Sequence, residues 1–259
     1  MKHKHTPLIL SFMLTILMIQ PLSAEITGKK IMEDVYNKPT GDDMQGELTM
    51  TLTNKQGETR VRTLKQYIKY GDKMDKKIMF FQSPADVRGT SFMNWSYADG
   101  RDDDQWIYLP ALKRTKRISS DGRSDNFMGS DFTYDDLGDR HPDEDTHTLL
   151  REETLEGKAC WVVESIPKEE DYMYSKTITW VMKDNYLGLR REFYDEDGDL
   201  LKILTIKKYD LIDGFWTILE TEMKNVQKDH KTNMAFNNVQ IDQGIPDSRF
   251  TERSMTLGR

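Results

Sequence analysis

The feature of this sequence that most limits its fold is a two-residue alternation of apolar and polar side chains. It is clearest over residues 44–53 and returns, segment after segment, as far as residue 240. Because successive side chains of a β-strand point to opposite faces, this alternation is typical of strands with one buried face and one solvated face. Polar turns containing Gly or Asp separate the segments at hairpin spacing. We therefore predict about a dozen antiparallel strands in a large curved sheet or barrel. The predicted strands are 44–53, 58–70, 76–82, 90–97, 105–118, 147–153, 159–166, 176–183, 188–194, 200–209, 215–226 and 232–240.

The first 39 residues do not follow this alternation. Lys2 and Lys4 precede an apolar run over residues 8–19, and the small residues Ser23 and Ala24 follow it. This order predicts a secretory signal peptide over residues 1–24, cleaved near Ala24. The apolar run is shorter than the roughly 20 residues that span a bilayer, so an uncleaved anchor is the weaker alternative. Residues 25–39 have helical spacing and end at Pro39, which predicts a helix packed on the concave face of the sheet.

Composition narrows the class of protein further. The chain is 31% charged with a formal charge of −7, and it has a single cysteine, Cys160. A polytopic membrane protein and a disulfide scaffold are excluded, and the acidic balance argues against nucleic acid as a partner. Cys160 lies in an apolar run, which favours a buried and unreactive thiol. We expect residues 25–259 to form a single β domain and the protein to be a monomer.

The sequence contains no motif that indicates catalysis. His141, His147 and His230 do not have the spacing of metal ligands, and no nucleophile elbow or phosphate-binding loop is present. We therefore expect no metal, no cofactor and no enzymatic activity. The acidic segment 195–199 is interpreted as a solvated hairpin turn, since it lacks the distal glutamate of a calcium loop. The basic run over residues 113–117 has two interpretations, the solvated end of a strand or a docking patch for anionic lipid headgroups.

Four segments in order form a more specific pattern: FFQSPADVRGT at 80–90, QWIYLP at 105–110, GSDFTYDDL at 129–137 and IPDSRFT at 245–251. Together they resemble the LolA-like periplasmic proteins that sort outer membrane lipoproteins. The similarity spans nearly all of the chain after residue 24, and is greatest to a largely uncharacterised subfamily related to a treponemal protein. It implies a mainly β fold, a half-open antiparallel β-barrel with helices covering its concave face.

The resemblance also implies a function. Such proteins carry lipids or lipoprotein acyl chains in an apolar cavity towards the outer membrane, with transient membrane contact. Members often accompany inner-membrane transporters of the resistance-nodulation-division (RND) type, which makes such a transporter a candidate partner. Two alternatives stay open: an envelope sensor of the same fold, and a periplasmic hydrolase.

Bulky apolar side chains mark the expected ligand site. Trp95, Trp106 and Tyr108 are predicted to form its wall, and residues 119–141 are predicted to cover it as a lid. A static structural plug is the alternative for that segment. The predicted cavity and lid residues are Met50, Met79, Phe81, Phe92, Trp95, Trp106, Tyr108, Phe127, Met128, Phe132 and Tyr134.

Overall fold

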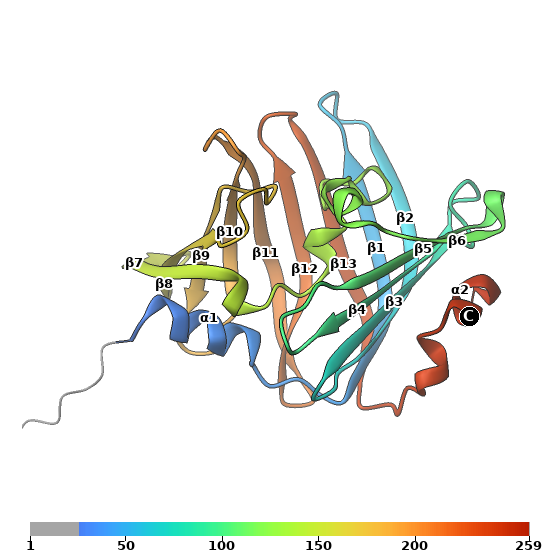
Figure 1. Ribbon diagram of the computed structural model, residues 1–259, viewed down its shortest axis with the longest axis horizontal. Helices are drawn as coiled ribbons and strands as arrows, with labels where there is room; N and C mark the ends of the chain where they lie inside the picture. Colours follow the sequence, from blue (N-terminus) through green and yellow to red (C-terminus); the bar gives the residue numbers. More distant parts are fainter. Residues whose placement is uncertain (1–25, 259) are drawn as a thin grey trace, which may run out of the picture.

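A computed structural model describes residues 26–258, so the predicted signal peptide lies outside the described residues. Its main feature is one thirteen-stranded antiparallel sheet that curves around a concave side (Figure 1). The spatial order is β6-β5-β4-β3-β2-β1-β13-β12-β11-β10-β9-β8-β7. The strands are β1 (Asp43–Thr53), β2 (Thr59–Lys69), β3 (Met74–Ser83), β4 (Ser91–Tyr97), β5 (Asp104–Leu109), β6 (Arg114–Arg117), β7 (Asp145–Leu155), β8 (Lys158–Pro167), β9 (Lys176–Met182), β10 (Gly188–Tyr194), β11 (Leu200–Ile212), β12 (Phe215–Asn225) and β13 (His230–Ile241).

The predicted mainly β, antiparallel architecture is confirmed, with two corrections to its details. The first is that the sheet is open: within residues 26–258, β6 and β7 form its two edges. The second is that the segment predicted as one strand over 105–118 is two strands. Pro110 has no N–H for a sheet hydrogen bond, and Lys113 adopts a left-handed φ of 48°, so the chain turns between β5 and β6.

The first and last strands in the sequence are neighbours in the middle of the open sheet. β1 pairs with β13, with Met50 opposite Met234. Since this pairing joins the N-terminal meander β1–β6 to the C-terminal meander β7–β13, residues nearly 200 positions apart become neighbours on one face. For example, the side chains of Gln45 and Gln240 lie 2.8 Å apart.

The helix α1 (Gly28–Tyr36) covers one end of the concave face. Thr27 caps it by accepting a hydrogen bond from the backbone N–H of Lys30 at 3.2 Å. Its buried side chains Ile31 and Met32 pack on Trp161, Val163 and Val181 of β8 and β9. Gly28 allows this approach, because a Cβ there would lie 2.7 Å from the backbone nitrogen of Leu149. The prediction of a helix on the concave face near 25–39 is therefore confirmed for Gly28–Tyr36.

The second helix, α2 (Glu252–Leu257), lies on the opposite face, which corrects the expectation that helices cover the concave side. The C-terminal segment places Ile245, Phe250 and Met255 against Ile78 and Phe80 of β3. Part of the concave face is instead covered by residues 119–141, here called the inner segment. Three short 3-10 turns, Ser120–Ser124, Phe127–Gly129 and Asp135–Leu137, make up about half of it, and it is drawn in green inside the curve of the sheet (Figure 1). None of the helices within residues 26–258 is long and apolar enough to cross a membrane.

Candidate functional site

The largest apolar cluster lies where the inner segment meets the concave face. Phe127 packs between Phe81 and Phe92, with ring centroids 5.9 Å and 5.2 Å away. Tyr134 closes the group at 5.6 Å from Phe127. The structure brings together most of the residues predicted from the sequence, and packs them into a solid core. The predicted residues in or against this cluster are Met50, Met79, Phe81, Phe92, Phe127, Met128, Phe132 and Tyr134.

The predicted wall residues Trp95, Trp106 and Tyr108 lie elsewhere, which is a correction. They pack in the cluster beneath the C-terminal segment, on the other face of the sheet. The physical reason is the two-residue period of a strand: Ile107 points to the inner cluster, so its neighbours Trp106 and Tyr108 must point away. The alternation along 105–109 already carried this information. These three side chains therefore cannot lie beneath the inner segment.

An open cleft of about 720 Å³ lies beside the core, between α1, the inner segment and the inner surface of the sheet. Its volume is in the range typical of small-ligand sites. Of the predicted ligand-binding residues, only Phe132 lines it. The apolar part of its lining includes Met32, Val35, Ile68, Met74, Phe132, Phe193, Leu204 and Met223. Sequence reasoning missed the others, because their grouping depends on strands that are distant in the chain.

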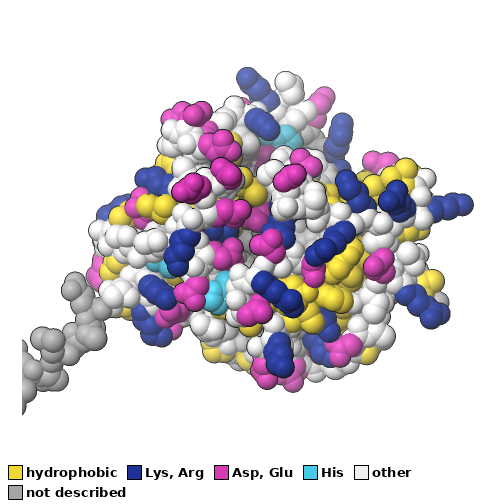
Figure 2. All heavy atoms as spheres, viewed as in Figure 1, with side chains coloured by type: hydrophobic (Ala, Val, Ile, Leu, Met, Phe, Trp, Pro, Cys, Tyr) yellow, Lys and Arg dark blue, Asp and Glu magenta, His cyan; other side chains and the backbone are white. Residues whose placement is uncertain are grey.

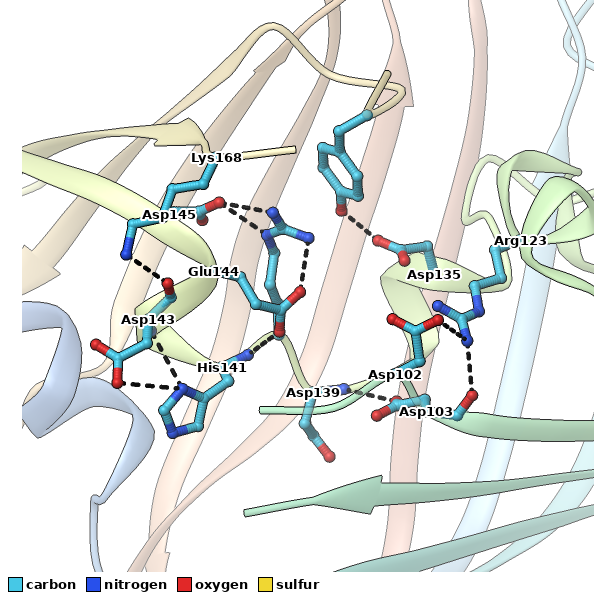
Figure 3. A network of polar contacts seen from close by, with 12 residues as sticks. Asp102, Asp103, Arg123, Asp135, Asp139, His141, Asp143, Glu144, Asp145 and Lys168 are labelled. Atoms are coloured by element: carbon cyan, nitrogen blue, oxygen red, sulfur yellow. Dashed lines mark hydrogen bonds and ion pairs between the residues drawn. The ribbon is translucent and has the colours of Figure 1, made fainter. Parts of the chain in front are cut away.

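Charged side chains surround the cleft. Figure 2 shows acidic, basic and histidine side chains mixed across this face. In the close-up, Glu144 and Asp145 stand on one side of the network and Asp135 on the other (Figure 3). Arg140 donates two hydrogen bonds to Asp145, at 2.9 and 2.7 Å, and one to Glu144 at 3.0 Å. Burial raises the pKa of the Asp135 carboxyl, which accepts a hydrogen bond from the Tyr172 hydroxyl.

Buried polar contacts tie the inner segment to the sheet. Asp136 forms an ion pair with Lys202 of β11, and the two side chains are only 5% and 3% exposed. Asp131 accepts a hydrogen bond from Thr232 at 2.7 Å and contacts His230 Nδ1 at the same distance. These contacts connect residues 66 to 101 positions apart. They anchor the second half of the inner segment to β11 and β13.

Three cations that line the cleft, Lys38, Lys77 and Arg191, form no ion pair within residues 26–258. Arg191 of β10 lines the cleft and donates from Nε to Thr179 Oγ1 at 3.0 Å. Its terminal amino groups have no hydrogen-bond partner within residues 26–258. The acids that most favour its charged form, Asp145 and Asp136, are engaged by Arg140 and Lys202. Burial lowers the pKa of Arg191, since desolvation penalises the charged form.

Two further features bear on reactivity, the free cysteine and possible clusters of metal ligands. Cys160 is fully buried and free, and burial raises the pKa of its thiol. Within residues 26–258, no three or more His, Cys, Asp or Glu side chains are placed to hold a metal ion.

The fold has clear counterparts among solved structures. A LolA superfamily protein from Nitrosomonas europaea is 19% identical with a TM-score of 0.68, and the match covers 89% of this chain and all of that one. That likeness defines the class: the chain has a LolA-like fold.

Two further structures are more similar in sequence. One is a candidate outer membrane lipoprotein-sorting protein domain from Vibrio parahaemolyticus: 33% identity, TM-score 0.83, covering 88% of this chain and 98% of that one. The other is a DUF1329 family protein from Desulfovibrio piger: 32% identity, TM-score 0.82, covering 88% and 97%. A family profile described only as "uncharacterized protein" matches residues 73–257. No curated protein matches the chain. The chain belongs to the LolA-like family of outer membrane lipoprotein-sorting proteins.

Proposed function

We propose that this protein is a periplasmic binding protein that carries a lipid, or the acyl chain of a lipoprotein, towards the outer membrane. The observation that supports the proposal is the cleft on the concave face, with an apolar floor formed by Phe132, Phe193, Leu204 and Met223. Burying a CH₂ group contributes about 0.8 kcal/mol, so partial enclosure of about a dozen carbons is enough for useful affinity. The polar rim suits the part of a lipid that remains in water.

The proposal differs from the predicted cavity in its location. The side chains around Phe127 pack against one another and leave no room for cargo. The cargo would therefore lie beside them, in the cleft next to α1. Phe132 belongs to both, because it packs in the cluster and lines the cleft. Of these predicted ligand-binding residues, we therefore expect Phe132 to contact the cargo, rather than Met50, Met79, Phe81 or Phe92.

Native mass spectrometry of protein purified from the periplasm tests the proposal. Co-purified lipid should appear as an added mass in the wild type. Leu204→Glu, which places a charge on the apolar floor, should reduce its occupancy at least several-fold. Thr205→Glu is the matched control, since this neighbouring residue faces away from the cleft. Ligand-free protein that also takes up no added lipid would contradict the carrier function.

The proposal also covers the protein's secretion, its oligomeric state and its partner in the cell. The protein would be secreted by the signal peptide 1–24, act as a monomer, touch membranes only transiently and exchange cargo with an RND-type inner-membrane transporter. Crosslinking in intact cells tests the last point. Recovery of such a transporter with the wild type supports it, and recovery of a single signalling protein instead would favour the sensor alternative.

A further inference from the structure

The cleft combines an apolar floor with a cation that lacks a dedicated counterion. Phe193 and Arg191 belong to the same strand, β10, and both line the cleft. Residues two apart in a strand point to the same face and lie about 7 Å apart. The guanidinium is therefore within the reach of one short ligand segment from the apolar surface of Phe193.

One hydrogen bond orients the guanidinium of Arg191. Nε is held by Thr179 Oγ1 at 3.0 Å, on the adjacent strand β9. This leaves the two terminal amino groups without a partner among the described residues of the chain. A planar guanidinium with two free amino groups matches the paired oxygens of a phosphate or a carboxylate.

The charges around Arg191 leave room for an anion. Asp145 is shared with Arg140, which also binds Glu144, and Asp136 is paired with Lys202. His147 also lines the cleft, and burial lowers its pKa, which favours the neutral ring. Its Nε2 lies 2.8 Å from the carbonyl oxygen of Pro142 and donates to it, and its Nδ1 lies 2.8 Å from the Ser165 hydroxyl.

The other acids that line the cleft are Asp42, Asp72, Asp75, Asp135 and Asp139. Asp75 and Asp139 act electrostatically on Lys38, which has Lys77 as a further neighbour. Of the cations that line the cleft, Arg191 is the one on the strand of Phe193. An anionic group whose chain lies on Phe193 would therefore be held at Arg191, on the β10 side of the cleft.

We propose that Arg191 binds the anionic headgroup, a phosphate or carboxylate, of an acyl lipid whose chain lies on Phe193, Leu204 and Met223. This inference rests on the proposed carrier function and adds to it the chemical class of the cargo. Thr179 is a positioning residue, because it holds the guanidinium without facing the headgroup itself.

Calorimetry with three probes tests the inference: dodecyl phosphate, its uncharged twelve-carbon counterpart glycerol monolaurate, and inorganic phosphate. Both amphiphiles are used below their critical micelle concentrations. We expect dodecyl phosphate to bind the wild type more tightly than glycerol monolaurate. Arg191→Gln should weaken dodecyl phosphate roughly ten- to a hundredfold and leave glycerol monolaurate unchanged.

The strand offers a matched control and a second variant. Arg190 is the neighbouring arginine on the other face, where it pairs with Glu192 at 2.6 Å, so Arg190→Gln should change neither affinity. Thr179→Val keeps the charge of Arg191 and removes its orientation, so it should cause a smaller loss for dodecyl phosphate alone. Thermal melting of each variant shows that it is folded.

The outcomes separate the two proposals. If both amphiphiles bind but Arg191→Gln leaves their ratio unchanged, the headgroup inference is wrong and the carrier function stands. If inorganic phosphate binds as tightly as dodecyl phosphate and depends on Arg191, the ligand is free phosphate and the lipid assignment is wrong. If no probe binds, both proposals fail.

Discussion

Burial shifts the protonation of individual side chains on the concave face. His147 is the clearest case: its Nε2 donates to the carbonyl oxygen of Pro142, and its Nδ1 contacts the Ser165 hydroxyl, which can donate or accept. Burial is the main cause that lowers the pKa of His147 below its usual 6.5. Protonation would place a charge in a partly buried site, where desolvation penalises it.

The lowered pKa of His147 predicts a dependence of stability on pH. In the unfolded chain this histidine gains a proton near pH 6.5, whereas in the folded protein it does so only at lower pH. The unfolded state therefore binds more protons in that interval, and stability is lost as pH falls from about 7 through the folded pKa. Urea denaturation of His147→Gln should show lower stability at pH 7.5 and a flatter profile between pH 7 and 5. The raised pKa of buried Asp135 acts in the opposite direction, so the difference between the two proteins is the informative quantity. Parallel profiles would contradict the assignment.

The ion pair between Lys202 and Asp136 predicts a large effect of a single truncation. Removing Lys202 leaves a carboxylate buried without its counterion, which costs about 3–5 kcal/mol. Lys202→Ala should lower the free energy of unfolding by that amount, as measured by urea denaturation. Lys207→Ala on the same strand is the control, since Lys207 is exposed and its loss should cost less than about 0.5 kcal/mol. A cost below about 1 kcal/mol for Lys202→Ala would show that the pair does not anchor the inner segment.

At the scale of elements, the inner segment has two halves with different supports. Residues 119–126 are exposed or partly exposed, whereas Phe127, Ser130, Asp131 and Phe132 are buried. Asp131 and Asp136 fasten the second half through buried polar contacts. These anchors favour a fixed plug for 127–137, and leave 119–126 as the part that can act as a lid.

Hydrogen exchange measured with and without lipid distinguishes the lid from the plug. Amides in 127–137 should exchange about as slowly as those of β1 and β2 in both states, because opening them breaks the buried ion pair. Amides in 119–126 should exchange faster and should gain protection when lipid is bound. Fast exchange across all of 119–141 without lipid would support the original prediction that the whole segment is a gate.

At the scale of the whole molecule, the open sheet exposes two strand edges. β6 is one of them, and its residues Arg114, Lys116 and Arg117 are exposed. Charged side chains on an edge strand oppose pairing with a second copy. The basic run over residues 113–117 therefore has two candidate roles. It can keep the β6 edge from pairing with a second copy, or it can dock on anionic lipid headgroups.

Replacing Arg114 and Lys116 together with Thr tests the role of the β6 edge. If these charges prevent edge pairing, light scattering should show dimers or larger species at micromolar to millimolar concentrations, while the wild type stays monomeric. The pair Lys207→Thr and Lys208→Thr, exposed on β11, which is not an edge strand, is the control for lost charge. A variant that stays monomeric but no longer binds anionic vesicles would support the docking interpretation instead.

Much of this protein follows from local sequence pattern, because strand alternation and turn chemistry act between neighbouring residues. The strands, the helix before Pro39 and the burial of Phe127 and Phe132 were predictable for that reason. The break after Leu109 was signalled by Pro110, although only the positive φ of Lys113 shows that the strand ends there.

The site itself was decided by the tertiary structure. The cleft brings Met32 of α1 into the same lining as Leu204 of β11, and Lys202 reaches Asp136 across 66 residues. Such neighbours are set by the pairing of β1 with β13 and by the curvature of the sheet, which no local pattern specifies. Alternation predicts that a side chain such as that of Arg191 points to one face. Only the folded sheet shows that this face is the floor of a cleft, and that the acids around Arg191 already have partners.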